Sequence, residues 1–208
     1  MKKRLHDKKA GIAILAALII ISLAEIIFRA TVIGEAILTT ANLGEQLAVV
    51  VLAATILVLN AKGKDRACYI LYFAWISYFV FDQIFEFPGV VMGIINQMAQ
   101  IENFAAFLAM GAIIRILGMV GIIVIGVLLV EYMNDGTIYN RAFNVLCIIT
   151  VLLLAANIVG SIYSALVIHS KFALETFHNL YRLAMVFLCA FFAYDSAKMQ
   201  KNKVKISK

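Results

Sequence analysis

Charged and polar side chains lie inside long apolar stretches of this sequence, and these are the residues that could do chemistry. Arginines in such a place could hold an anionic group, and carboxylates could hold a cation. A charge deep in a bilayer costs about 2.5 to 3.5 kcal/mol even on a mild insertion scale, so these side chains should face one another or water. The candidate ligand-binding residues are Glu25, Arg29, Asp82, Glu86, Arg115, Asn157, Glu175, His178 and Arg182.

The spacing of these residues favours shared helix faces, because residues three, four or seven apart in a helix lie on one side. Glu25 precedes Arg29 by four residues, and Asp82 precedes Glu86 by four. Two neighbouring carboxylates could form a proton or cation site, or each could pair with an arginine, and the sequence leaves both readings open. The sixth apolar run aligns a further acid, imidazole and guanidinium: Glu175, His178 and Arg182.

The composition requires lipid around most of the chain. Of 208 residues, 64% are hydrophobic and 14% are charged, whereas a soluble domain is roughly half apolar. The net charge of +6 comes from basic residues near the chain ends and in short connections, which favours anionic lipid headgroups over nucleic acid as the partner.

We therefore predict an all-α, polytopic transmembrane bundle of about six helices with short connections. The predicted domains are a basic cytoplasmic N-terminus over 1–10, one bundle over 11–197 and a short basic cytoplasmic tail over 198–208. Phe87-Pro88-Gly89 should break or kink the third helix. The expected helices cover 11–33, 44–61, 68–97, 104–131, 142–168 and 172–197.

The distribution of Lys and Arg predicts that both termini are cytoplasmic, with the protein in the cell membrane. In that orientation fourteen of the eighteen basic residues fall on the cytoplasmic side. With a rise of about 1.5 Å per residue and a hydrocarbon core of about 30 Å, the candidate residues lie from the midplane outward. The sequence therefore predicts a polar cluster in the outer half of the bundle.

Cofactor and catalytic motifs are not evident in the sequence. Haem and zinc sites need several aligned ligands, and His178 is the one histidine that lies deep inside a predicted transmembrane helix. We therefore expect no metal, no cofactor and no catalytic residue. Walker, Rossmann and G-x-S-x-G patterns do not occur. The three cysteines are too far apart in sequence for a metal-binding CxxC pair, and we interpret them as core residues.

Three functions remain as hypotheses. The first is a non-enzymatic protein that binds or transports a small polar or charged molecule through an outer-facing pocket lined by Arg and Asp or Glu. The second is a structural or accessory subunit whose buried ion pairs specify helix packing. In that case partner helices would dock on the Ala13 and Ala17 face or on the Gly118, Gly121 and Gly126 face. The third is a membrane enzyme that uses His178.

Overall fold

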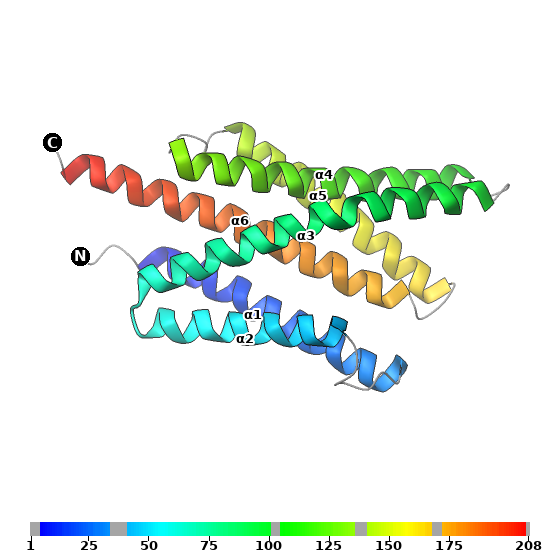
Figure 1. Ribbon diagram of the computed structural model, residues 1–208, viewed down its shortest axis with the longest axis horizontal. Coiled ribbons are helices and arrows are strands. Elements are labelled where there is room, and N and C mark those ends of the chain that lie inside the picture. Colours follow the sequence, from blue (N-terminus) through cyan, green and yellow to red (C-terminus); the bar gives the residue numbers. More distant parts are fainter. Residues whose placement is uncertain (1–4, 34–40, 101–104, 136–140, 168–171, 207–208) are drawn as a thin grey trace. The chain divides into compact units, whose positions relative to one another are not determined.

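The structure, a computed structural model, is entirely helical apart from one short turn in the part that it describes, residues 5–33, 41–100, 105–135, 141–167 and 172–206. Six α-helices and one π-helical segment, η1, make up these ranges (Figure 1). The prediction of an all-α protein is confirmed. The elements are α1 (Leu5–Phe28), η1 (Arg29–Ile33), α2 (Ala41–Ala61), α3 (Asp65–Gln100), α4 (Ala105–Asp135), α5 (Arg141–Val167) and α6 (Phe172–Ile206).

All six α-helices contain stretches that are long and apolar enough to cross a membrane, since a span needs about 20 residues. Large apolar side chains also cover much of the helix surface. Phe85 and Val159 are both 68% exposed, and Leu166 is 82% exposed. Side chains of this kind repeated along six helices would be unfavourable in water, whereas lipid solvates them. The chain is a multi-pass membrane protein.

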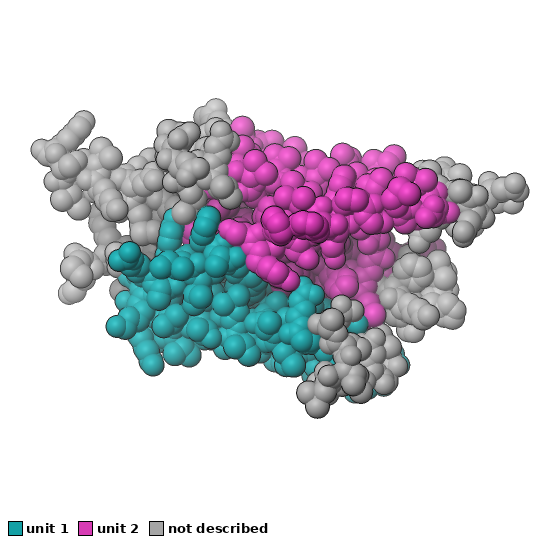
Figure 2. Space-filling view, viewed as in Figure 1, with its two compact units in different colours: residues 1–75 teal, residues 76–208 magenta. Residues whose placement is uncertain are grey.

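Two compact units divide the chain, residues 1–75 and residues 76–208, which we call unit 1 and unit 2 (Figure 2). Helix α3 contributes its first eleven residues to unit 1 and the remainder to unit 2. We describe each unit by itself, and a single bundle over 11–197 stays a prediction.

In unit 1, α1 packs against α2, with Leu15, Leu18 and Ile56 fully buried. Helix α2 ends in a tight turn at Gly63, whose φ of 67° lies in the left-handed region that glycine adopts without steric cost. The amide of Gly63 donates to the Asn60 carbonyl at 3.2 Å, which satisfies an orphan carbonyl at the helix end. The chain reverses here, and α3 begins two residues later.

In unit 2, small residues on α4 allow close approach of its neighbours. A Cβ atom on Gly121 would overlap the Thr150 side chain of α5, and one on Gly126 would overlap the Val80 side chain of α3. At Gly118 a Cβ atom would lie 3.5 Å from Leu154 of α5. The prediction that this glycine face docks a partner helix is therefore wrong, because helices of the same chain already cover it.

Helix α3 is continuous through Pro88 from Asp65 to Gln100, so of the break or kink predicted at this proline only a kink is still open. Proline lacks the N–H that would bond the carbonyl four residues earlier. Membrane helices tolerate this loss because neighbouring groups satisfy the freed carbonyl. The kink stays a prediction.

Helix α6 also runs further than predicted, to Ile206. Its last turns contain neither glycine nor proline, and lysines are favourable near the negative end of a helix dipole. The basic tail is therefore an extension of α6 as far as that residue.

Candidate functional site

One end of unit 2 carries the polar residues. The C-terminal ends of α3 and α5 and the N-terminal ends of α4 and α6 lie at this end, on the right of Figure 1. Arg115 and Arg182 each lie ten residues from the start of their helix, or about 15 Å at a rise of 1.5 Å per residue. The two guanidinium groups therefore enter the bundle at a similar depth from the same end.

Arg182 forms the most buried connection of this region, and its side chain is 8% exposed. Its Nε donates to Gln83 Oε1 at 2.8 Å, and its Nη2 donates to Glu86 Oε2 at 2.7 Å. The amide Nε2 of Gln83 lies 3.4 Å from Glu86 Oε2, to which it donates. Three side chains thus form a hydrogen-bonded network that joins α6 to α3.

Arg115 forms a second ion pair, which joins α4 to α6. Its Nη1 lies 2.6 Å from Glu175 Oε1, and the two side chains are 34% and 30% exposed. The Nε atom of Arg115 is buried, and within the described part of the chain it has no hydrogen-bond partner. The side chain of Arg115 is more exposed than that of Arg182. A ligand could therefore reach the guanidinium of Arg115.

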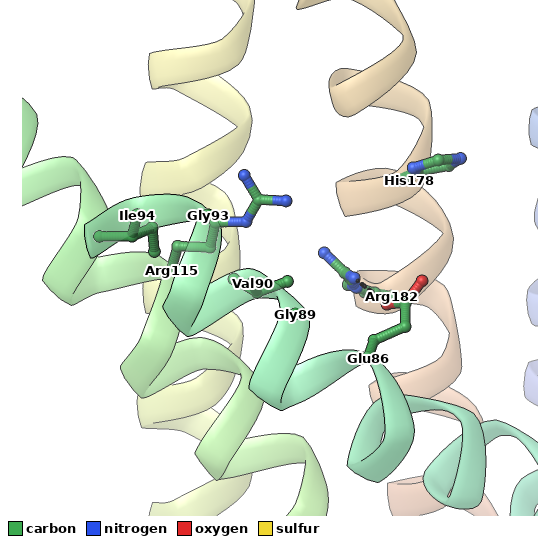
Figure 3. Close-up of a pocket in the computed structure, with 8 residues that line it drawn as sticks. All are labelled: Glu86, Gly89, Val90, Gly93, Ile94, Arg115, His178 and Arg182. Atoms are coloured by element: carbon green, nitrogen blue, oxygen red, sulfur yellow. Dashed lines mark hydrogen bonds and ion pairs between the residues drawn. The ribbon is translucent and has the colours of Figure 1, made fainter. Parts of the chain in front are cut away.

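A cavity of about 410 Å³ lies beside both arginines (Figure 3). Its volume is within the range of about 300 to 1,000 Å³ that is usual for small-molecule sites. In the close-up the side chains of Arg115 and Arg182 come toward the same space from α4 and α6, with His178 one turn from Arg182. The residues that line this Arg115–Arg182 cavity are Glu86, Gly89, Val90, Gly93, Ile94, Arg115, His178 and Arg182.

Four of the nine candidate residues line the cavity, and Glu175 pairs with one of them. Asp82 does not line it; it accepts a hydrogen bond of 3.3 Å from the neighbouring Gln83. Asn157 of α5 also lies elsewhere, 3.5 Å from the position of a Cβ on Gly118. Asn157 therefore belongs to the contact of α4 with α5.

Glu25 and Arg29 belong to unit 1, where they pair with each other. The Nε and Nη2 atoms of Arg29 donate to Glu25 Oε1 at 2.9 and 2.8 Å, and both side chains are buried. The acid precedes the arginine by four residues, which is the favourable order in a helix. Whether this pair joins a common cluster with the residues of unit 2 stays a prediction.

The sequence analysis missed Gln83, Gly89 and Gly93. Gln83 is 3% exposed, and a glutamine between Asp82 and Glu86 in an apolar run is a signal that could have been used. Gly89 and Gly93 are four residues apart, a spacing common in membrane helices. Their place on the cavity wall depends on the rotation of α3, for which the sequence holds no direct signal.

Comparison of the chain with protein-family models, with curated proteins and with solved structures gave no match. The site therefore has to be interpreted from its own geometry.

Proposed function

We propose that this protein binds or transports a small molecule with an anionic group, and that the Arg115–Arg182 cavity is its binding site. The observation that carries this proposal is that two arginines from different helices border one cavity of ligand size.

The charges of the cavity favour an anion. Two arginines and one glutamate line it, together with His178. A guanidinium has five N–H donors, and among the described residues Arg115 pairs through Nη1 while Arg182 donates through Nε and Nη2. The remaining donors can bind a carboxylate or phosphate, which forms short charge-assisted hydrogen bonds with arginine. A cation would meet carboxylates that arginines already neutralise.

The distribution of basic residues supports an outer location for the cavity. The α2–α3 turn carries Lys62 and Lys64, the first turn of α3 carries Arg66, and the last turns of α6 carry further lysines. Basic segments stay on the cytoplasmic side, so we propose that both termini are cytoplasmic and that the protein lies in the cell membrane. The helix ends that border the cavity then face outward.

Ligand binding to the purified protein in phosphatidylcholine nanodiscs tests the proposal. Equilibrium dialysis would measure binding of radiolabelled acetate, octanoate and inorganic phosphate, with empty nanodiscs subtracted. We expect saturable binding of at least one anion, weakened tenfold or more by Arg115→Gln. The matched control is Arg66→Gln, which removes an exposed arginine from the first turn of α3.

Two results would contradict the proposal. The first is that the wild-type protein binds none of the three anions above the level of empty nanodiscs. The second is equal weakening by Arg66→Gln and Arg115→Gln, which would assign the effect to net charge.

A second function is favoured by the ion pairs themselves. Arg115 with Glu175 joins α4 to α6, and Arg182 with Glu86 joins α6 to α3. Such cross-links could serve helix packing alone, as in a structural or accessory subunit. In that case Arg115→Gln lowers stability or assembly, and the wild-type protein binds no ligand. The exposed Ala13 of α1 then marks a face for a partner helix.

A further inference from the structure

The two sides of the Arg115–Arg182 cavity differ in chemistry. Beyond Glu86, its α3 wall consists of Gly89, Val90, Gly93 and Ile94 and contains no polar side chain. Figure 3 shows these four residues following Glu86 along α3. From Glu86 to Ile94 this wall is about 12 Å long at a rise of 1.5 Å per residue. The polar side chains of Arg115, His178 and Arg182 come from α4 and α6.

The glycines of this wall border open space and do not serve helix packing within the described structure. A Cβ atom on Gly89 or Gly93 would have no neighbouring atom within 4 Å. By contrast, a Cβ atom on Gly121 or Gly126 of α4 would overlap a side chain of the adjacent helix. The missing side chains at Gly89 and Gly93 therefore enlarge the cavity next to the arginines.

We infer that the ligand is an amphipathic anion, whose charged group binds Arg115 and Arg182 and whose aliphatic part lies along the apolar α3 wall. This inference rests on the proposed function and adds the chemical class of the ligand. Removal of an aliphatic chain from water is favourable in proportion to the area that becomes buried. A compact anion gains the arginine contacts but leaves the apolar wall uncovered. Free alkyl carboxylates and anionic lipids share this chemistry.

Chain length and a change in the α3 wall together test the inference. In phosphatidylcholine nanodiscs we expect octanoate to bind at least tenfold more tightly than acetate, which has the same carboxylate and no chain. Gly93→Leu fills the open space and should weaken octanoate binding tenfold or more, with acetate binding changed less than twofold. Octylammonium, with the same chain and the opposite charge, should not bind above the level of empty nanodiscs.

Gly160→Leu is the matched control, because Gly160 of α5 also has no atom within 4 Å of a Cβ position and does not line the cavity. It should leave the affinity for octanoate unchanged. Because neither leucine meets the rest of the protein at Cβ and leucine is a better helix former than glycine, both variants should unfold at the temperature of the wild-type protein or above it. Thermal unfolding verifies this before binding is measured.

A second membrane composition distinguishes an anionic lipid from a free carboxylate as the ligand. Addition of phosphatidylglycerol to the nanodiscs should weaken octanoate binding tenfold or more if an anionic lipid occupies the cavity, and should leave it unchanged if the ligand is a free carboxylate. Either result supports an amphipathic anion.

Equal affinities for acetate and octanoate would overturn the inference and leave the proposed function intact, and so would a Gly93→Leu variant that binds octanoate as the wild type does. Absence of binding by all anions would overturn both.

Discussion

At the scale of single residues, the two arginines of unit 2 occupy different environments although both lie ten residues into their helices. Arg182 is 8% exposed and its partner Gln83 is 3% exposed. Arg115 and its partner Glu175 are each about one-third exposed. Loss of a partner costs more for a buried polar group than for a partly exposed one. Arg182 is thus the more structural of the two and Arg115 the more accessible to a ligand.

Replacement of each arginine by methionine should separate these roles. Arg182→Met leaves the buried amide of Gln83 without its donor, and we expect a loss of about 1 to 3 kcal/mol in the free energy of unfolding. Arg115→Met should cost about 1 kcal/mol or less, because its ion pair is partly exposed. Unfolding by a denaturing detergent, followed by circular dichroism, measures both. A larger loss for Arg115→Met would contradict this assignment.

At the scale of the helices, α4 approaches its neighbours through glycines. Gly121 faces Thr150, whose hydroxyl donates to the Leu146 carbonyl at 2.8 Å, so the contact with α5 leaves this hydroxyl satisfied. Gly126 faces Val80 of α3. Apolar helices in lipid gain little from hydrophobic burial against one another, and close van der Waals packing replaces it. The glycines therefore determine how near α3 and α5 come to α4.

Alanine substitutions along α4 should have opposite effects on stability. Gly126→Ala forces α3 and α4 apart or displaces the Val80 side chain, and overpacking of this kind costs about 1 to 3 kcal/mol. Gly111→Ala meets no atom within 4 Å and should be neutral or stabilising by up to about 1 kcal/mol, because alanine is the better helix former. Thermal unfolding in nanodiscs compares the two. Equal effects of the two substitutions would show that Gly126 is not a packing residue.

At the scale of the whole molecule, the function depends on orientation in the membrane. Both termini and the α2–α3 turn should be cytoplasmic, because they hold most of the basic residues. The cavity would then open toward the outer side, from which a ligand could enter.

Cysteine labelling in intact cells tests this orientation. The native Cys68, Cys147 and Cys189 are buried, so the wild-type protein should label weakly with a membrane-impermeant maleimide and serves as the background. We expect Lys64→Cys to be labelled only after the cells are permeabilised. Lys171→Cys, in the α5–α6 connection, should be labelled in intact cells. The reverse pattern would place the cavity on the cytoplasmic side.

Hydropathy along the chain was enough to predict the class of protein and the approximate positions of the six helices that the structure describes. Hydropathy is a local property, and an apolar stretch of about 20 residues needs no knowledge of its neighbours to be recognised as a span. The similar distance of Arg115 and Arg182 from the starts of their helices follows for the same reason, because the rise per residue converts position in the chain into distance along the helix. Local rules were less accurate at Pro88, which lies within a continuous α3, and at the basic tail, where α6 continues to Ile206.

Which side chains meet could not be predicted from the chain alone. Whether Arg182 pairs with Glu86 or with Asp82, and whether a glycine packs on a helix or borders a cavity, depends on the rotation and register of each helix. These two quantities are determined by side-chain packing between segments distant in sequence. Gly126 and Gly93 are indistinguishable by composition, yet one lies against Val80 and the other borders the cavity. Position along each helix was therefore predictable from the chain alone, whereas the direction in which a side chain points around the helix axis was not.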